Sequence, residues 1–200
     1  RVVKAALSTA DFTHRVLGPK RMQGMMDGLR KLSGKRLGHW TPSMPTAAES
    51  IHASKALRLQ PEFVKKVVYL PSCASRTMGP AFKVKDKTET QASTFDVTIR
   101  LLNKAGYQVI LPQNIDQLCC GMPFESKGLF EQAGEKADEL LNALYLASNS
   151  GEYPIYSDTS PCSMRLLELY DKGLSLYDSV TFIHDFLLRE LTFTQLDSKL

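Results

Sequence analysis

The sequence lacks long apolar runs, and none of its runs approaches the roughly 20 residues that a membrane-spanning helix needs. It also has no charged segment followed by an apolar segment of the kind that directs secretion. The first residue is Arg1 rather than Met. We therefore expect part of a longer protein, located in the cytoplasm, that does not cross a membrane.

Cysteine is scarce, with four residues in 200, and no Cys-x-x-Cys pair is present. Bacterial ferredoxin clusters and structural zinc sites usually use such short spacings, so neither common local metal motif applies. The four histidines are scattered without a His-x-x-x-His pair, and we interpret them as surface or packing residues. Because a chain of this length can form a hydrophobic core without disulfides, a reducing compartment is favoured.

The chain also lacks zinc-finger, RNP and nucleotide-cradling glycine motifs, and its net charge is only +4. Basic residues gather between positions 15 and 36, but no aromatic residues are interleaved with them. We expect no nucleic-acid partner. The basic stretch is interpreted as a solvated helix face, and peripheral contact with an anionic membrane surface or an acidic redox partner is the alternative.

Hydrophobic periodicity predicts an α/β fold with a mainly parallel sheet, flanking helices and a helical N-terminal linker. Residues 2–36 follow helical spacing and are divided at Gly18-Pro19. Short apolar runs predict buried strands at 64–70, 107–111 and 154–157. Further helices are predicted at 95–105, 126–144, 163–170 and 180–191, and an exposed loop at 80–90. The predicted domains are a linker over 1–60 and an α/β domain over 61–200.

Two details of the long helix are predicted from single residues. Ser126 is expected to be its N-terminal cap, because a serine hydroxyl accepts a hydrogen bond from the first free amides of a helix. Gly134 destabilises a helix interior by about 1 kcal/mol relative to alanine, which predicts close packing against a neighbour.

All four cysteines follow the predicted strands. Cys73 comes after the first, Cys119 and Cys120 after the second, and Cys162 after the third. In an open parallel sheet, ligands bind beyond the carboxyl ends of the strands, so these thiols should meet at one edge.

Cys119 and Cys120 are adjacent, a spacing that strains a disulfide between them. Gly121, which follows, permits a tight turn. Soft sulfur ligands suit iron–sulfur clusters and related metal sites, so a thiolate ligand set is the leading interpretation. A redox thiol pair and structurally buried cysteines remain open as alternatives.

Three motifs carry a family resemblance: Leu-Pro-Ser-Cys at 70–73, Leu-Cys-Cys-Gly-Met-Pro-Phe at 118–124 and Asp-Thr-Ser-Pro-Cys at 158–162. Together they resemble the CCG, or cysteine-rich, domain of Fe-S oxidoreductases, which is found in the heterodisulfide reductase B subunit and the glycolate oxidase iron–sulfur subunit. The sequence is most similar to the C-terminal iron–sulfur portion of FAD-linked D-lactate dehydrogenases. The resemblance covers roughly residues 64–192.

The resemblance implies an electron-transfer module of an oxidoreductase that acts on D-2-hydroxyacids, most readily D-lactate. It implies that Cys73, Cys119, Cys120 and Cys162 bind an iron–sulfur cluster of the 4Fe-4S type. A flavin domain with FAD and a ferredoxin-type module are implied elsewhere in the same polypeptide, with a quinone or cytochrome as the electron acceptor. These residues alone are not expected to oxidise lactate, and no catalytic residue is assigned to them.

One position departs from the family pattern, which often ends in Cys-x-x-Cys, because Thr159 occupies the first of these two positions. A four-thiolate cluster, an incomplete site and completion by a second such unit after Leu200 are the alternatives. Two other functions also stay open: a non-catalytic scaffold with structural or zinc-binding cysteines, and a thiol–disulfide reductase module.

Overall fold

The computed structural model describes residues 2–41, 44–81, 93–169 and 173–193. The chain forms two compact units, one made of residues 1–54 and 74–95 and the other of residues 55–73 and 96–200. The loop predicted at 80–90 lies outside the described residues except for positions 80 and 81, which belong to a strand rather than a loop.

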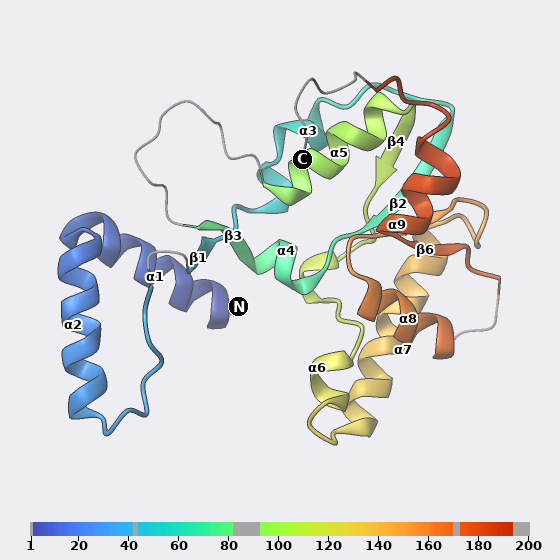
Figure 1. The fold of residues 1–200 in the computed structure, drawn as a ribbon. Coiled ribbons are helices and arrows are strands. Elements are labelled where there is room, and N and C mark those ends of the chain that lie inside the picture. The colour runs from blue at the N-terminus through green and yellow to red at the C-terminus, as the bar shows by residue number, and fades with distance from the viewer. Residues whose placement is uncertain (1, 42–43, 82–92, 170–172, 194–200) are drawn as a thin grey trace. The chain divides into compact units, whose positions relative to one another are not determined.

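The first unit contains the predicted helical N-terminal region (Figure 1). Helix α1 (Val2–Leu17) and helix α2 (Pro19–Leu32) are separated at Gly18, whose φ of 75° favours glycine. Buried Met22 packs with buried Trp40. Strand β1 (Pro45–Ala47) pairs in antiparallel orientation with β3 (Met78–Ala81), and a 3-10 turn spans Ile51–Ala53.

The second unit is built on a four-stranded parallel sheet with strand order β4-β2-β5-β6. The strands are β2 (Lys65–Leu70), β4 (Tyr107–Ile110), β5 (Ile155–Ser157) and β6 (Leu176–Asp178). The predicted α/β fold class is therefore confirmed. The first three strands match predicted runs, whereas β6 was not predicted.

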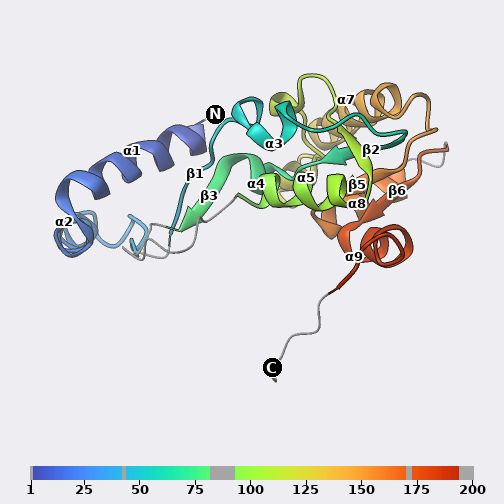
Figure 2. The same ribbon diagram turned by 90° about the horizontal axis from the view of Figure 1, so that it is seen from above.

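Seven further helices lie in the described part of the chain. They are α3 (Lys55–Arg58), α4 (Cys73–Thr77), α5 (Thr94–Lys104), α6 (Met122–Glu125), α7 (Phe130–Ala147), α8 (Ser160–Leu169) and α9 (Ser179–Phe182). A 3-10 turn spans Ile115–Gln117, and a π-helical turn over Ile183–Leu187 continues α9. In Figure 2 the strands β2, β5 and β6 lie between α7 on one side and α9 on the other.

Apolar side chains fill both faces of this sheet. The predicted apolar face of α7 is confirmed, since Ala133, Ala137, Leu140, Leu141 and Leu144 are buried. On α9, the fully buried ring of Phe182 contacts the rings of Tyr107 and Tyr156 edge to face. The central strands are thus covered on both sides, as a parallel sheet requires.

Two predictions about the long helix are wrong. Ser126 is not the cap of α7, because a separate short helix, α6, ends at Glu125 and α7 begins only at Phe130. Gly134 does not pack closely against a neighbour, since a Cβ atom built there meets no atom within 4 Å.

None of the helices in the described part of the chain is both long and apolar enough to span a membrane.

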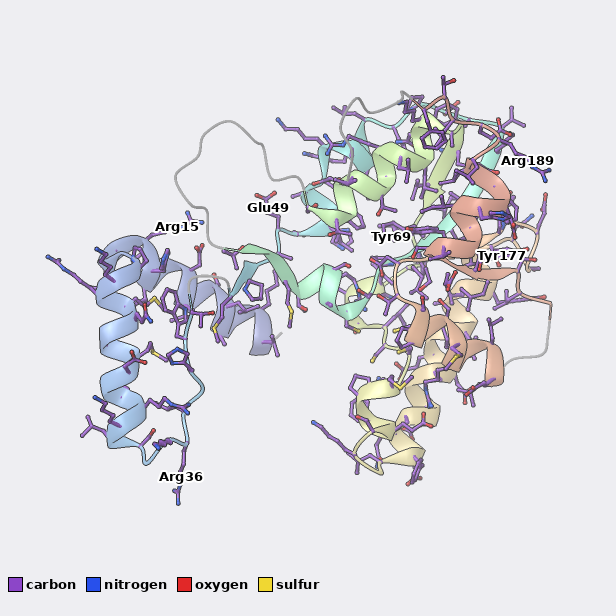
Figure 3. The ribbon with its side chains drawn as sticks, in the orientation of Figure 1. Arg15, Arg36, Glu49, Tyr69, Tyr177 and Arg189 are labelled. Atoms are coloured by element: carbon purple, nitrogen blue, oxygen red, sulfur yellow. The ribbon has the colours of Figure 1, made fainter. Side chains whose placement is uncertain are left out.

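The basic stretch lies on and after α1 and α2. Arg15 forms an ion pair with Asp11 at 2.6 Å and remains largely exposed, and Figure 3 shows Arg15 and Arg36 extending away from their backbone segments. Exposed side chains fit both a solvated face and peripheral membrane contact, so both interpretations stay predictions.

Candidate functional site

Three adjacent strands of the second unit deliver the four cysteines to one edge of the sheet. Cys73 follows β2 after two residues and begins α4, and Cys162 lies in the first turn of α8, just after β5. Cys119 and Cys120 follow β4 by way of the short 3-10 turn. Because β2 is central between β4 and β5, the three connections leave the sheet side by side.

The thiols contact one another in a chain. Cys73 Sγ lies 3.9 Å from Cys119 Sγ, and Cys120 Sγ lies 3.1 Å from Cys162 Sγ. Cys119 and Cys120 are neighbours in the chain, and this adjacency joins the two pairs. No disulfide links the four cysteines. The Cys120 side chain is buried, and the other three are partly exposed. The structure thus brings together all four residues that the sequence singled out.

Gly121 explains why the adjacent cysteines can turn so sharply. Its φ of 84° lies in the left-handed region that glycine adopts at little cost. A Cβ atom at this position would lie only 2.2 Å from the carbonyl oxygen of Ala133 in α7. The Gly121 N–H points back and donates to Cys119 Sγ at 3.5 Å. Any other residue here would displace the cysteine loop from α7.

Arg165 is a residue of the site that the sequence analysis missed. Its buried side chain on α8 donates from Nε to the Cys120 carbonyl oxygen at 2.8 Å and forms an ion pair with Glu125 at the end of α6. The guanidinium therefore ties the cysteine loop to the helix that carries Cys162. The available signal was spacing, because Arg165 lies three residues after Cys162 and hence on the same helical face.

Asp158 links the end of β5 to the loop that carries Cys73. Its Oδ1 atom accepts from the Ser72 N–H at 2.7 Å, and its Oδ2 atom accepts from the Tyr69 hydroxyl at 3.0 Å. Figure 3 labels Tyr69 within the second unit. Burial, and next the charge of Asp158, raise the pKa of Tyr69, so the phenol stays protonated and keeps donating. Asp158 thus fixes the residue directly before Cys73.

The environment of Cys120 favours its neutral thiol in the metal-free protein. Hydrogen bonding with the Cys119 and Cys162 thiols, followed by burial, raises the pKa of Cys120. A bound metal ion reverses this preference, because a coordinating thiol is deprotonated by the cation. Metal binding at this site would therefore release protons.

The donor chemistry fits a thiophilic metal or an iron–sulfur cluster, since four sulfur atoms from three loops gather where a backbone amide also donates to sulfur. Among the residues that the structure describes, no three His, Cys, Asp or Glu side chains are already arranged as a metal-binding group. The contacts are pairwise, so a bound group would require the thiols to move.

No protein-family model, curated protein or solved structure matches the chain. The resemblance to the CCG domain therefore depends on the three motifs alone and stays a prediction.

Proposed function

We propose that this chain is an electron-transfer module in which Cys73, Cys119, Cys120 and Cys162 hold an iron–sulfur centre. The convergence of thiols from three different strand ends supports this proposal most directly, because cysteines 46 and 42 positions apart in the chain bring their sulfur atoms to one edge of the sheet. A cluster held by cysteine thiolates transfers electrons. The protein residues contribute the ligands, and Gly121, Arg165 and Asp158 hold the loops that carry them.

The parent protein, in this proposal, is an FAD-linked dehydrogenase of D-2-hydroxyacids, with D-lactate as the leading substrate. This part of the proposal depends on the motif resemblance. Electrons would pass from a flavin domain through this module toward a quinone or cytochrome acceptor. The protein would act in the cytoplasm, with peripheral contact at the cytoplasmic membrane face as the alternative to a fully soluble location.

Iron and sulfide analysis of the anaerobically reconstituted chain tests this function. We expect about four iron atoms per chain for a cluster of the 4Fe-4S type and an EPR signal after reduction. Cys162→Ser should abolish both, while the control Met164→Ala changes an exposed side chain of the same helix and should keep both. A chain that binds no iron while its four thiols remain reduced would contradict the proposal.

A structural zinc site is a second candidate, and one distance favours it. Tetrahedral Zn²⁺ with Zn–S bonds of about 2.3 Å places its sulfur ligands about 3.8 Å apart, close to the 3.9 Å between Cys73 and Cys119. A cluster puts each thiolate on a different iron atom and needs a wider spacing. Stoichiometric zinc in place of iron, with no EPR signal, would select this second function.

A further inference from the structure

We propose that Cys120 and Cys162 form a disulfide when the metal-free site meets a peroxide, with Cys162 as the thiol that is oxidised first. Their Sγ atoms are 3.1 Å apart, closer than the 3.9 Å between those of Cys73 and Cys119. A disulfide bond is about 2.05 Å long, so this pair needs to close by only about 1 Å. This inference holds whether the site binds an iron–sulfur centre or zinc.

Two of the other pairings are disfavoured by geometry. Cys73 and Cys119 lie 3.9 Å apart, so their sulfur atoms must move almost twice as far. Cys119 and Cys120 are adjacent in the chain, a spacing that strains a disulfide. Arg165 further favours the Cys120–Cys162 pair, because its Nε atom donates to the Cys120 carbonyl oxygen at 2.8 Å and its helix also carries Cys162.

The solvent exposure of the two side chains indicates which thiol is oxidised first. Cys162 is partly exposed, whereas only 4% of Cys120 is accessible. Hydrogen peroxide therefore reaches Cys162 before Cys120: an S–O bond forms, the O–O bond breaks, and one water leaves, giving a sulfenic acid. Cys120 sulfur then attacks Cys162 sulfur, the S–O bond breaks, and the departing hydroxide takes the Cys120 thiol proton and leaves as a second water. The two electrons lost by the thiols reduce one peroxide, so no other oxidant is needed.

Peptide mapping of the full chain tests the pairing. The metal-free protein is treated with one equivalent of hydrogen peroxide, alkylated and digested with trypsin. Cys73, the adjacent pair and Cys162 fall in separate peptides, 67–76, 105–127 and 137–165. We expect a cross-link between 105–127 and 137–165, and fragment ions should assign it to Cys120. A first disulfide that includes Cys73, or four thiols that are alkylated equally, would overturn the proposal.

Matched serine variants test the two roles. Cys119→Ser should keep the cross-link, whereas Cys120→Ser should abolish it and leave a sulfenic acid on Cys162 that dimedone labels. Dimedone labelling of Cys73 instead would contradict the order of oxidation. The wild-type mapping decides the pairing even where a variant fails to fold. Metal content measured before metal removal reports separately on the proposed function, so the two proposals can fail independently.

Discussion

At the scale of single residues, Gly121 and Gly134 should respond oppositely to the same substitution. Gly121→Ala places a methyl group against the Ala133 carbonyl at a left-handed φ, so we expect a loss of about 2 to 5 kcal/mol in the free energy of unfolding. Gly134→Ala meets no atom within 4 Å in a helix interior, and we expect a gain of up to about 1 kcal/mol. Urea unfolding measures both; equal effects would refute the close contact at Gly121.

Arg165 provides a second prediction at this scale. Arg165→Met removes the partner of the Cys120 carbonyl and of Glu125 while filling a similar volume, and should cost about 1 to 3 kcal/mol in unfolding free energy. Glu168→Gln, which changes an exposed residue of the same helix, should stay within about 0.5 kcal/mol. The double variant Arg165→Met with Glu125→Gln should lose less unfolding free energy than the two single variants lose together. Strict additivity would show that the ion pair contributes nothing.

At the scale of elements, Asp178 joins the beginnings of two helices. Its Oδ1 atom accepts from the Thr181 N–H at 2.9 Å and caps α9, while the Ser160 hydroxyl at the start of α8 donates to Oδ2 at 3.1 Å. The hydrogen bonds from Thr181, with a further one from Ser160, hold the pKa of Asp178 below its usual 3.8. A lowered pKa stabilises the fold above pH 3.8, and this contribution disappears as the pH falls through the folded-state value.

We therefore expect Asp178→Ala to lower the unfolding free energy by about 0.5 to 2 kcal/mol at pH 7. The difference from wild type should shrink as the pH falls below 3.8, because the wild-type carboxylate then becomes protonated. Asp178→Asn keeps a capping oxygen without the charge and should be nearly as stable as wild type at pH 7. Thermal unfolding from pH 2 to 7 measures this, and a pH-independent effect of Asp178→Ala would contradict it.

The strands β2, β4 and β5 could be predicted from sequence because each is a short apolar run bounded by proline or glycine. Their parallel arrangement then implied that Cys73, Cys119, Cys120 and Cys162 meet. Strand β6 was missed because it has only three residues, and only Leu176 among them is buried. The true start of α7 was missed because Ser126 is a good capping residue, yet α6 intervenes and uses Ser126 at its own end.

Arg165 shows why part of the site lay beyond sequence reasoning. Charged side chains are almost always exposed unless they are paired, and the pairing partners of Arg165 come from the cysteine loop and from α6. Only the folded chain brings those groups together. The same holds for Asp158, whose carboxylate accepts from the Ser72 N–H of a different strand connection.

At the scale of the whole molecule, the chain has a helical N-terminal unit and an α/β unit that carries every cysteine. The fold class follows from the alternation of strands and helices. The function depends on whether the four thiols act as one ligand set, which is a property of the assembled second unit rather than of any single element.

Cobalt titration of the metal-free full chain under anaerobic conditions tests that claim most directly. If the four thiols act together, thiolate-to-cobalt charge-transfer absorption should saturate at about one Co²⁺ per chain, with the intense visible bands of tetrahedral coordination. Each of Cys73→Ser, Cys119→Ser, Cys120→Ser and Cys162→Ser should weaken both the absorption and the affinity. A wild-type chain without charge-transfer absorption would contradict a single site built from three strand ends. The same conclusion would follow if Cys73→Ser and Cys162→Ser bound Co²⁺ with the absorption and affinity of wild type.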